Sequence, residues 1–508
     1  MELTFWDTIA FVLFLTVVIG VSLYASRKED NSEDYFLAGR NLAWWLVGFS
    51  LIASNISTEH FVGMAGSGFG ATGLAVASYE WIAAITLVLM GMFLLPLFLR
   101  LGIYTMPEFL EHRYGAPART LMAVYMMVAY IGVAIASVLY SGAIGLQAIF
   151  DLDLSFGIWL IGILAGTYTV YGGLKAVVWS DLLQGVALII GGIIVTIIGF
   201  QHVGGVEAFF TQNADKLHVG LPADHPDIPW TALILGIWIP NFFYWGFNQF
   251  ITQRTLGSKS LAQGQKGIVL AAFIKLIIPF IIVFPGIMAF QLYGAEITNG
   301  DQAYPILIKN LLPAGLRGIL FAALFGAIMS SLDSMLNSAS TIFTMDIYKK
   351  YIKPDAETSQ VVKVGRVATA IFVVAGCLMA PLPGSFEGVF QYIQMIWGFI
   401  SPGIVAVFIF GLIFRRAPLS AALAAMILGI PVYGVLLWLL PEVAFLNHMA
   451  VTFIILVAVM GILTLVKPLP QPVRFTTQSS IDLTPSPLAN TLGWIVIVLT
   501  ILLYIVFW

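Results

Sequence analysis

Oxygen-bearing residues follow one another at helical spacing between Gly326 and Thr341, in the run GAIMSSLDSMLNSAST. Ala327, Ser330 and Ser331 fall at positions i, i+3 and i+4, so one carbonyl and two hydroxyls can face the same point. Such oxygens suit a hard cation, and the absence of a Cys/His cluster argues against zinc or copper. Alternatively, the serines only hydrogen-bond to the preceding turn. The spacing repeats one turn later in Ser330, Asp333 and Ser334.

A second source of oxygen ligands is the span from Ala43 to Gly70, which is apolar enough to cross a bilayer but has a polar middle. A break in a helix at membrane depth persists only where protein or a polar cavity supplies hydrogen-bond partners. Carbonyls freed near Ala53 and Ile56 could complete a cation cage. The alternative is a kink packed against a neighbouring helix. The polar residues are Ser54, Asn55, Ser57, Thr58, Glu59 and His60, and Gly63, Gly66, Gly68 and Gly70 follow them.

Ionisable side chains at membrane depth usually mark a pathway or a partner pair. A single lysine, Lys275, cannot neutralise several acids, so we expect bound cations to supply the remaining positive charge. These ionisable residues are Glu59, His60, Glu80, Asp181, Lys275 and Asp333.

The other polar residues can be assembled into a site for a hydroxyl-rich ring. Such a ring needs donors, acceptors and a flat face for its C–H groups. A carboxylate substrate would more often require an Arg, and we expect none within the membrane. Each aromatic residue could instead face the bilayer or pack. The predicted site takes Glu80 as acceptor, Lys275 as donor, Asn241 and Gln394 as both, and Tyr79, Tyr244 and Trp245 as flat faces.

The elements that position these residues are membrane helices, because 60% of the 508 residues are hydrophobic and only 10% are charged. We expect a retained first helix and no cleaved signal peptide. The net charge of −3 suggests no nucleic-acid partner, and a single cysteine, Cys377, allows no intrachain disulfide. Stretches of about 20 apolar residues predict fourteen helices, starting near Phe5, Ala43, Gly73, Pro117, Leu154, Val178, Trp230, Ala262, Ala303, Val362, Gly388, Leu419, Leu446 and Leu492.

An even number of helices puts both termini on one side of the membrane. With the N-terminus outside, nineteen of the twenty-three Lys and Arg residues fall on the inner side, as the positive-inside rule requires. The stretch from Trp238 to Arg254, with Pro240 inside it, begins five spans after the first break and predicts a second one. Two broken helices in corresponding places predict an inverted-repeat transporter with five helices per half.

Several motifs, in order along nearly the whole chain, resemble the sodium/solute symporter family, and specifically its sodium/sugar branch. They are SEDYFLAGRNLAWW (32–45), ASYEW (77–81), YGGLKAVVWSDLLQ (171–184), YWGFNQFITQRTL (244–256), SSLDSMLNSASTIFTMDIY (330–348) and QYIQ (391–394).

The resemblance implies an all-α membrane protein of fourteen helices with a LeuT-type five-plus-five core. One transport domain would span residues 1–508, with an extra helix and loop in 1–42, the core in 43–415 and extra helices in 416–508. Sodium would bind the backbone oxygens of Ala53, Ile56 and Ala327 and the hydroxyls of Ser330 and Ser331. Sugar would contact Glu80, Asn241, Lys275 and Gln394, with Asn55 linking the broken helix to the sugar site. Tyr244 would be the inner gate, beside Trp245, while Met64, Tyr79 and Phe390 would close the outside.

Three further residues carry open alternatives. The resemblance places Asp181 on the inward exit route. His60 replaces a Gln of the bacterial galactose symporter pattern but matches animal glucose cotransporters, which keeps hexose binding and leaves the preferred hydroxyls open. Asp333 replaces a small residue, and it could build a second sodium site with Asp181 and Ser334 or only bond Ser330 or Ser334.

The sequence therefore predicts a sodium-driven sugar symporter that works by alternating access in the plasma (inner) membrane, without covalent chemistry. Its partners would be sodium, a small sugar such as glucose or galactose, and the lipid bilayer, and no oligomeric state is predicted. Alternatives are a symporter for myo-inositol or sialic acid, a proton-coupled carrier, and a receptor that binds without transport.

Overall fold

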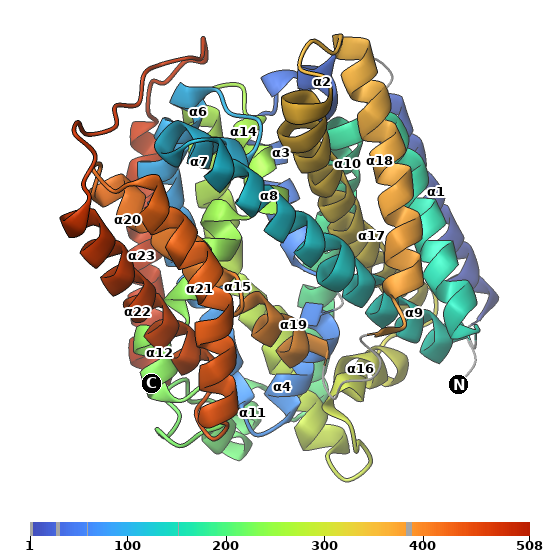
Figure 1. The fold of residues 1–508 in the computed structure, drawn as a ribbon. Coiled ribbons are helices and arrows are strands. Elements are labelled where there is room, and N and C mark those ends of the chain that lie inside the picture. Colours follow the sequence, from blue (N-terminus) through green and yellow to red (C-terminus); the bar gives the residue numbers. More distant parts are fainter. Residues whose placement is uncertain (1–3, 27–30, 58, 151, 383–388) are drawn as a thin grey trace.

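Helices running between two ends of the molecule make up almost the whole structure (Figure 1). The computed structural model describes residues 4–26, 31–57, 59–150, 152–382 and 389–508, and only the backbone of 148–150 and 389–392. Within these ranges, β-structure is limited to two isolated bridges, Leu42 with Ser258 and Leu221 with Pro229. Ten helices in the same ranges are long and apolar enough to cross a membrane.

Six of these ten are single α-helices, matching predicted spans. They are α1 (Phe5–Ala25), α15 (Leu261–Tyr293), α18 (Thr358–Met379), α21 (Leu419–Leu439), α22 (Phe445–Val466) and α23 (Pro487–Phe507). Three more contain a short 3-10 or π-helical turn. These are η3 (Gly73–Ala77) with α5 (Ser78–Leu89), η4 (Met90–Leu94) and α6 (Leu95–Leu101); α8 (Ala116–Ala129) with η5 (Tyr130–Ile135) and α9 (Ala136–Phe150); and α17 (Leu316–Ile342) with η9 (Phe343–Ile352).

The tenth, α10 (Leu154–His202), joins the two helices predicted to start near Leu154 and Val178. A straight helix of its 49 residues would measure about 74 Å, far more than a bilayer core of about 30 Å. Gly173 breaks it with φ 52° and ψ −148°. A side chain there would also collide with the Tyr35 carbonyl oxygen, since a Cβ atom would lie 2.3 Å from it. The part of α10 that follows Gly173 thus begins just before Val178, the start predicted for that helix.

Three other predicted spans are interrupted. The first consists of α3 (Trp44–Asn55), η2 (Glu59–Met64) and α4 (Ala65–Phe69), and Ile56 after α3 is extended with ψ 104°. In the second, Asn248 is extended with ψ 123°, which separates α12 (Trp230–Leu235), α13 (Trp238–Phe242) and η7 (Phe243–Phe247) from α14 (Gln249–Leu256). These two breaks confirm the predicted discontinuities. The third consists of α19 (Val389–Trp397) and α20 (Ser401–Ile413).

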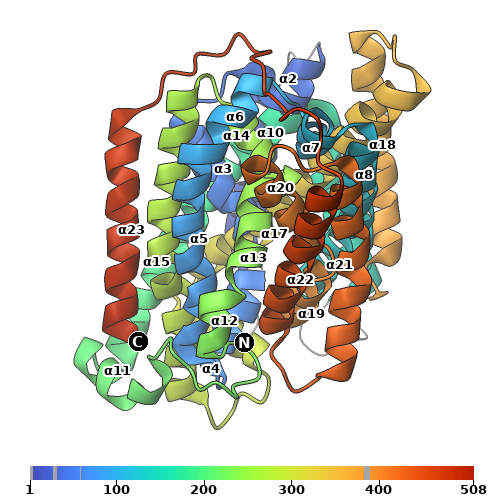
Figure 2. The same ribbon diagram turned by 60° about the vertical axis from the view of Figure 1, so that its left-hand side comes forward.

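All fourteen predicted helices have a counterpart, although the number of membrane crossings stays a prediction. One start is wrong, because the helix expected from Ala303 is the short α16 (Ala303–Leu311), and the long α17 begins only at Leu316. Three short helices lie in segments predicted as connections, namely α2 (Ser32–Leu37), α7 (Met106–Tyr114) and α11 (Val206–Gln212). The start of α1 and the end of α23 lie at the same end of the bundle in both views (Figures 1 and 2).

Burial separates central from peripheral helices. The apolar stretch of α17 is 94% buried, against 11% for α1 and 17% for α23. The helices that carry the predicted site therefore lie inside, whereas the first and last helices lie on the outside of the bundle.

Candidate functional site

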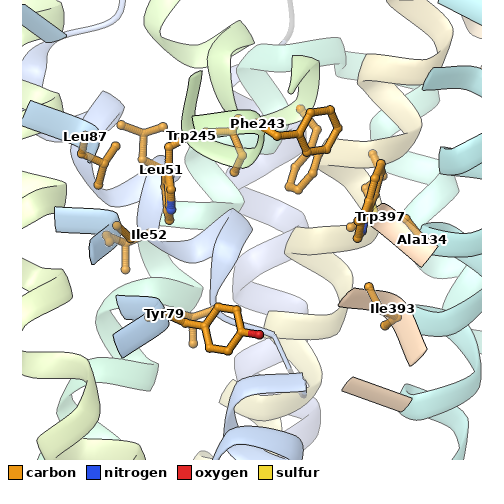
Figure 3. Packing of buried hydrophobic residues seen from close by; sticks show 14 of the residues in the cluster. Leu51, Ile52, Tyr79, Leu87, Ala134, Phe243, Trp245, Ile393 and Trp397 are labelled. Atoms are coloured by element: carbon orange, nitrogen blue, oxygen red, sulfur yellow. The ribbon is translucent and has the colours of Figure 1, made fainter. Parts of the chain in front are cut away.

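A cavity lined by both polar and aromatic side chains lies where the broken ends of α3 and η2 meet α5, η7 and α19. Figure 3 shows Tyr79, Phe243, Trp245, Ile393 and Trp397 around this space, and all five line the cavity. Seven of the eight predicted substrate residues also line it. They are Asn55, His60, Glu80, Asn241, Tyr244, Trp245 and Gln394.

A chain of hydrogen bonds crosses the wall of this cavity. The Lys275 ammonium donates to Glu80 Oε2 and to Asn55 Oδ1, and the Asn55 amide donates to the Tyr244 hydroxyl at 3.0 Å. Lys275 Nζ also lies 4.9 Å from the centre of the Trp245 ring, a cation–π distance. We define Asn55, Glu80, Tyr244 and Lys275 as the substrate cluster.

Lys275 is the predicted substrate residue that does not line the cavity. Its side chain is fully buried and engaged by Glu80, Asn55 and the Trp245 ring. In this arrangement it holds Glu80 and Asn55 in place and balances the carboxylate charge.

His60 lies beside the carboxylate oxygen of Glu80 that Lys275 does not contact. The Ser57 backbone N–H donates to His60 Nδ1 at 3.4 Å, which leaves the proton of a neutral imidazole on Nε2. Nε2 lies 3.4 Å from Glu80 Oε1. Both carboxylate oxygens of Glu80 therefore face a donor, which fixes the orientation of this acceptor beside the cavity.

Two of the three predicted outer-gate residues, Met64 and Tyr79, are buried and line the cavity. Phe390, the third, has a side chain outside the described residues.

α17, which carries three of the predicted sodium ligands, passes the end of α3, which carries Ala53. The Ser331 hydroxyl donates to the Ser54 carbonyl oxygen at 3.2 Å. Because α3 ends at Asn55, its last carbonyls, including that of Ala53, lie where the helix no longer supplies all their donors. A hydroxyl that donates its proton keeps lone pairs for a cation. The oxygen atoms present therefore fit a hard monovalent cation.

Asp181 gathers hydroxyls from two helices. Its Oδ1 accepts from Ser330 at 2.5 Å, and its Oδ2 accepts from Ser50 at 2.5 Å and from Ser54 at 3.1 Å. The Ser54 and Ser334 hydroxyls lie 2.9 Å apart. The carboxylate is fully buried. A predicted sodium ligand, Ser330, is thus bonded directly to a negative charge.

Asp333 faces away from this group. Its carboxylate accepts from the Tyr168 hydroxyl and, at 2.8 Å, from the Thr169 hydroxyl, both on α10. Bonds to Ser330 or Ser334 were one of the two alternatives for Asp333, but those two hydroxyls are donated to Asp181 and to the Ser330 carbonyl.

Arg254, which the sequence places on the inner side, is buried inside the protein. Its side chain is 1% exposed. Its Nε donates to Ser50 at 2.7 Å, its Nη2 donates to Ser334, and Nη2 lies 3.6 Å from Asp181. Arg254 does not line the cavity, so it does not supply the arginine that a carboxylate substrate would use. We define Ser50, Ser54, Asp181, Arg254, Ser330 and Ser334 as the ion cluster.

Comparisons with known proteins agree with this arrangement. A family model described as "Sodium:solute symporter family" matches residues 35–429. A sodium/glucose cotransporter of Vibrio parahaemolyticus is 41% identical over 100% of this chain and 99% of its own length. A sodium/myo-inositol cotransporter 2 of Oryctolagus cuniculus is 35% identical over 84% of this chain and 68% of its own length.

A solved structure is also similar. It is a substrate-bound, outward-open Na⁺-coupled sialic acid symporter with a TM-score of 0.83 and 24% identity, covering 93% of this chain and 99% of that one. This likeness confirms the all-α membrane fold with a LeuT-type core.

Proposed function

Because the chain belongs to the sodium:solute symporter family, we propose that it couples inward sodium movement to the uptake of a sugar by alternating access. It is a sodium-coupled transporter rather than an enzyme. The observation that carries the sugar proposal is the substrate cluster on the wall of the cavity, where a carboxylate acceptor is fixed between two donors. The name of the Vibrio relative, sodium/glucose cotransporter, supports a hexose such as glucose or galactose.

Each predicted ligand has a role in this proposal. Glu80 accepts from sugar hydroxyls, Asn241 and Gln394 offer both donors and acceptors, and Tyr244 and Trp245 give the sugar a flat apolar face. His60 and Lys275 orient Glu80. Met64, Tyr79 and Phe390 close the cavity to the outside, and Tyr244 closes it to the inside.

Sodium would be held between α3 and α17. The carbonyl oxygens of Ala53, Ile56 and Ala327 and the hydroxyls of Ser330 and Ser331 supply five oxygen atoms. Bound there, the ion ties the broken end of α3 to α17, so it favours the conformation in which the substrate cluster is assembled. Asp181, bonded to Ser330, provides the next oxygen on the route inward.

The contacts favour this exit-route role over a second sodium site built with Asp333. Both carboxylate oxygens of Asp333 accept from α10 hydroxyls, and Ser334 is engaged by Ser54 and Arg254. A second site would require these contacts to be exchanged for an ion.

Location and organisation follow the same proposal. The protein is a multi-pass membrane protein, and we place it in the plasma (inner) membrane with both termini on the extracytoplasmic side. Residues 43–415 form the inverted-repeat core within a single domain of 1–508, which has the lipid bilayer as its surroundings.

An uptake screen in proteoliposomes tests the proposal. Labelled glucose, galactose, myo-inositol, sialic acid and an amino acid are offered with an inward sodium gradient, with an inward proton gradient, and with neither. Hexose uptake driven only by sodium is expected. Preferential uptake of myo-inositol or sialic acid would replace the sugar assignment, and uptake driven fully by the proton gradient would contradict sodium coupling.

A further inference from the structure

The proposed function gives no role to the buried arginine of α14. Arg254 reaches three other helices, because its guanidinium contacts Ser50 of α3, Ser334 of α17 and Asp181 of α10. The arginine follows the break at Asn248, whereas Ser50 precedes the break after Asn55. Its contacts therefore join the two spans whose breaks were predicted from the sequence.

The same carboxylate serves Arg254 and the proposed sodium site. Asp181 lies 3.6 Å from Nη2 of Arg254 and accepts at 2.5 Å from the sodium ligand Ser330. A sodium ion at Ser330 and Ser331 would share the charge of Asp181 with the guanidinium. Two cations beside one buried carboxylate repel each other strongly, because the surroundings screen them poorly.

Building on the proposed function, we propose that Arg254 is a tethered cation that competes with sodium for Asp181. The Arg254–Asp181 pair is strongest in the sodium-free protein and weakens when sodium binds. By thermodynamic reciprocity, the pair in turn weakens sodium binding. Its effect is to hasten the release of sodium toward the inside.

The side chain is suited to such an exchange. A guanidinium keeps its charge under all physiological conditions, so it replaces a departing ion without having to gain a proton. Nη1 of Arg254 is buried and has no hydrogen-bond partner within the described residues. One nitrogen of the group is therefore left for a further acceptor, which suits an exchange of partners.

A static ion pair would give a different result when it is broken. It would stabilise the packing of α14 on α3 and α17, and its loss would lower stability without strengthening sodium binding. The affinity for sodium thus separates the two roles.

The test compares Arg254→Gln and Arg254→Lys in the full-length, purified protein. Sodium affinity is measured from the sodium-induced change in tryptophan fluorescence, and sugar uptake is measured in proteoliposomes. Arg254→Gln should bind sodium roughly tenfold more tightly and transport with a lower maximal rate, because release slows. Arg254→Lys, which keeps the charge, should lie close to wild type.

Arg113→Gln is the matched control. Arg113 is also a buried arginine, but it donates to the backbone carbonyls of Gly411, Phe414 and Ala417. This variant should lose stability without a gain in sodium affinity.

Unchanged or weaker sodium binding by folded Arg254→Gln would overturn the competition and leave a structural pair. If that variant does not fold, Ser50→Ala decides, because Ser50 bonds both Arg254 and Asp181. The Ser50→Ala variant must then bind sodium severalfold more tightly than wild type. An unchanged sodium affinity in this variant would overturn the proposal. A wild-type protein without any sodium response would instead refute the proposed function itself.

Discussion

Two buried clusters meet at the end of α3, and their charges are balanced differently. In the substrate cluster, one lysine pairs with one glutamate, so the cluster is neutral as a whole. In the ion cluster, Arg254 lies 3.6 Å from Asp181, and the hydroxyls of Ser50, Ser54 and Ser330 donate to the same carboxylate. A closely paired cluster suits an uncharged, hydroxyl-rich substrate, whereas a more loosely paired carboxylate surrounded by hydroxyls suits a monovalent cation.

Consecutive residues of α3 belong to the two clusters. Ser54 bonds Asp181 and Ser334, while Asn55 bonds Lys275 and Tyr244. A movement of this helix end therefore acts on both clusters together, which is the physical basis we propose for coupling.

The largest effect should come from removing the charge of the substrate cluster. Glu80→Gln leaves the Lys275 ammonium buried without a counter-ion, and breaking a buried pair costs about 3–5 kcal/mol. Sugar affinity should fall by roughly a hundredfold or more, measured by equilibrium binding, while sodium still changes the tryptophan fluorescence. Glu207→Gln on the exposed α11 is the control. Intact sugar affinity with a lost sodium response would reverse the assignment of the two clusters.

Removing a ligand from the ion side should have the next largest effect. Ser331→Ala deletes one of about five oxygens around a desolvated cation. A contact of this kind is comparable to a hydrogen bond to a charged group, which is worth about 1.5–3 kcal/mol. The sodium concentration for half-maximal uptake should therefore rise roughly tenfold or more. Ser340→Ala, on the same helix but bonded to the Gly365 carbonyl, should have no such effect. Transport by Ser331→Ala with unchanged sodium dependence would show that the site lies elsewhere.

A smaller change is expected where the inner gate touches the substrate cluster. Tyr244→Phe keeps the ring and removes only the hydroxyl that accepts from Asn55 at 3.0 Å. At about 1 kcal/mol for a hydrogen bond, sugar affinity should fall severalfold while sodium affinity stays near wild type. Tyr293→Phe at the end of α15 serves as the control. A tenfold change in sodium affinity would mean that the clusters are less distinct than proposed.

The smallest effect is expected for Asp333. A tenfold sodium gradient is worth about 1.4 kcal/mol and 100 mV about 2.3 kcal/mol per charge, so one sodium ion supplies roughly 3.7 kcal/mol per sugar. The contacts of Asp333 predict one charge per sugar, measured from reversal potentials, in both wild type and Asp333→Asn. A wild-type ratio of two that falls to one in the variant would establish the second sodium site.

The two breaks were predictable, because Pro240, Asn248 and the polar run around Asn55 are costly inside an apolar span unless the helix is interrupted. The break in α10 was also predicted, because hydropathy indicated two helices starting near Leu154 and Val178. Two short helices had local signals that hydropathy ignores, since Asn31 caps α2 and Thr105 caps α7 ahead of Glu108.

The tertiary partners of the buried charged residues could not be predicted from the sequence. Asp333 is bonded to Tyr168, 165 positions away, and spacing along one helix cannot reveal such a contact. The burial of Arg254 was missed for a related reason. The positive-inside rule assigns a cation near the end of an apolar run to the inner side, but it does not reveal that Asp181 and two serines offer that cation buried partners.

The most direct test of coupling is a reciprocal binding measurement on the wild-type protein. Hexose affinity is determined by isothermal titration with and without sodium, and sodium affinity is determined with and without the hexose. The account predicts that each ligand strengthens the other by the same factor, roughly tenfold. Hexose affinity that does not change with sodium would contradict the claim that the end of α3 joins the two clusters.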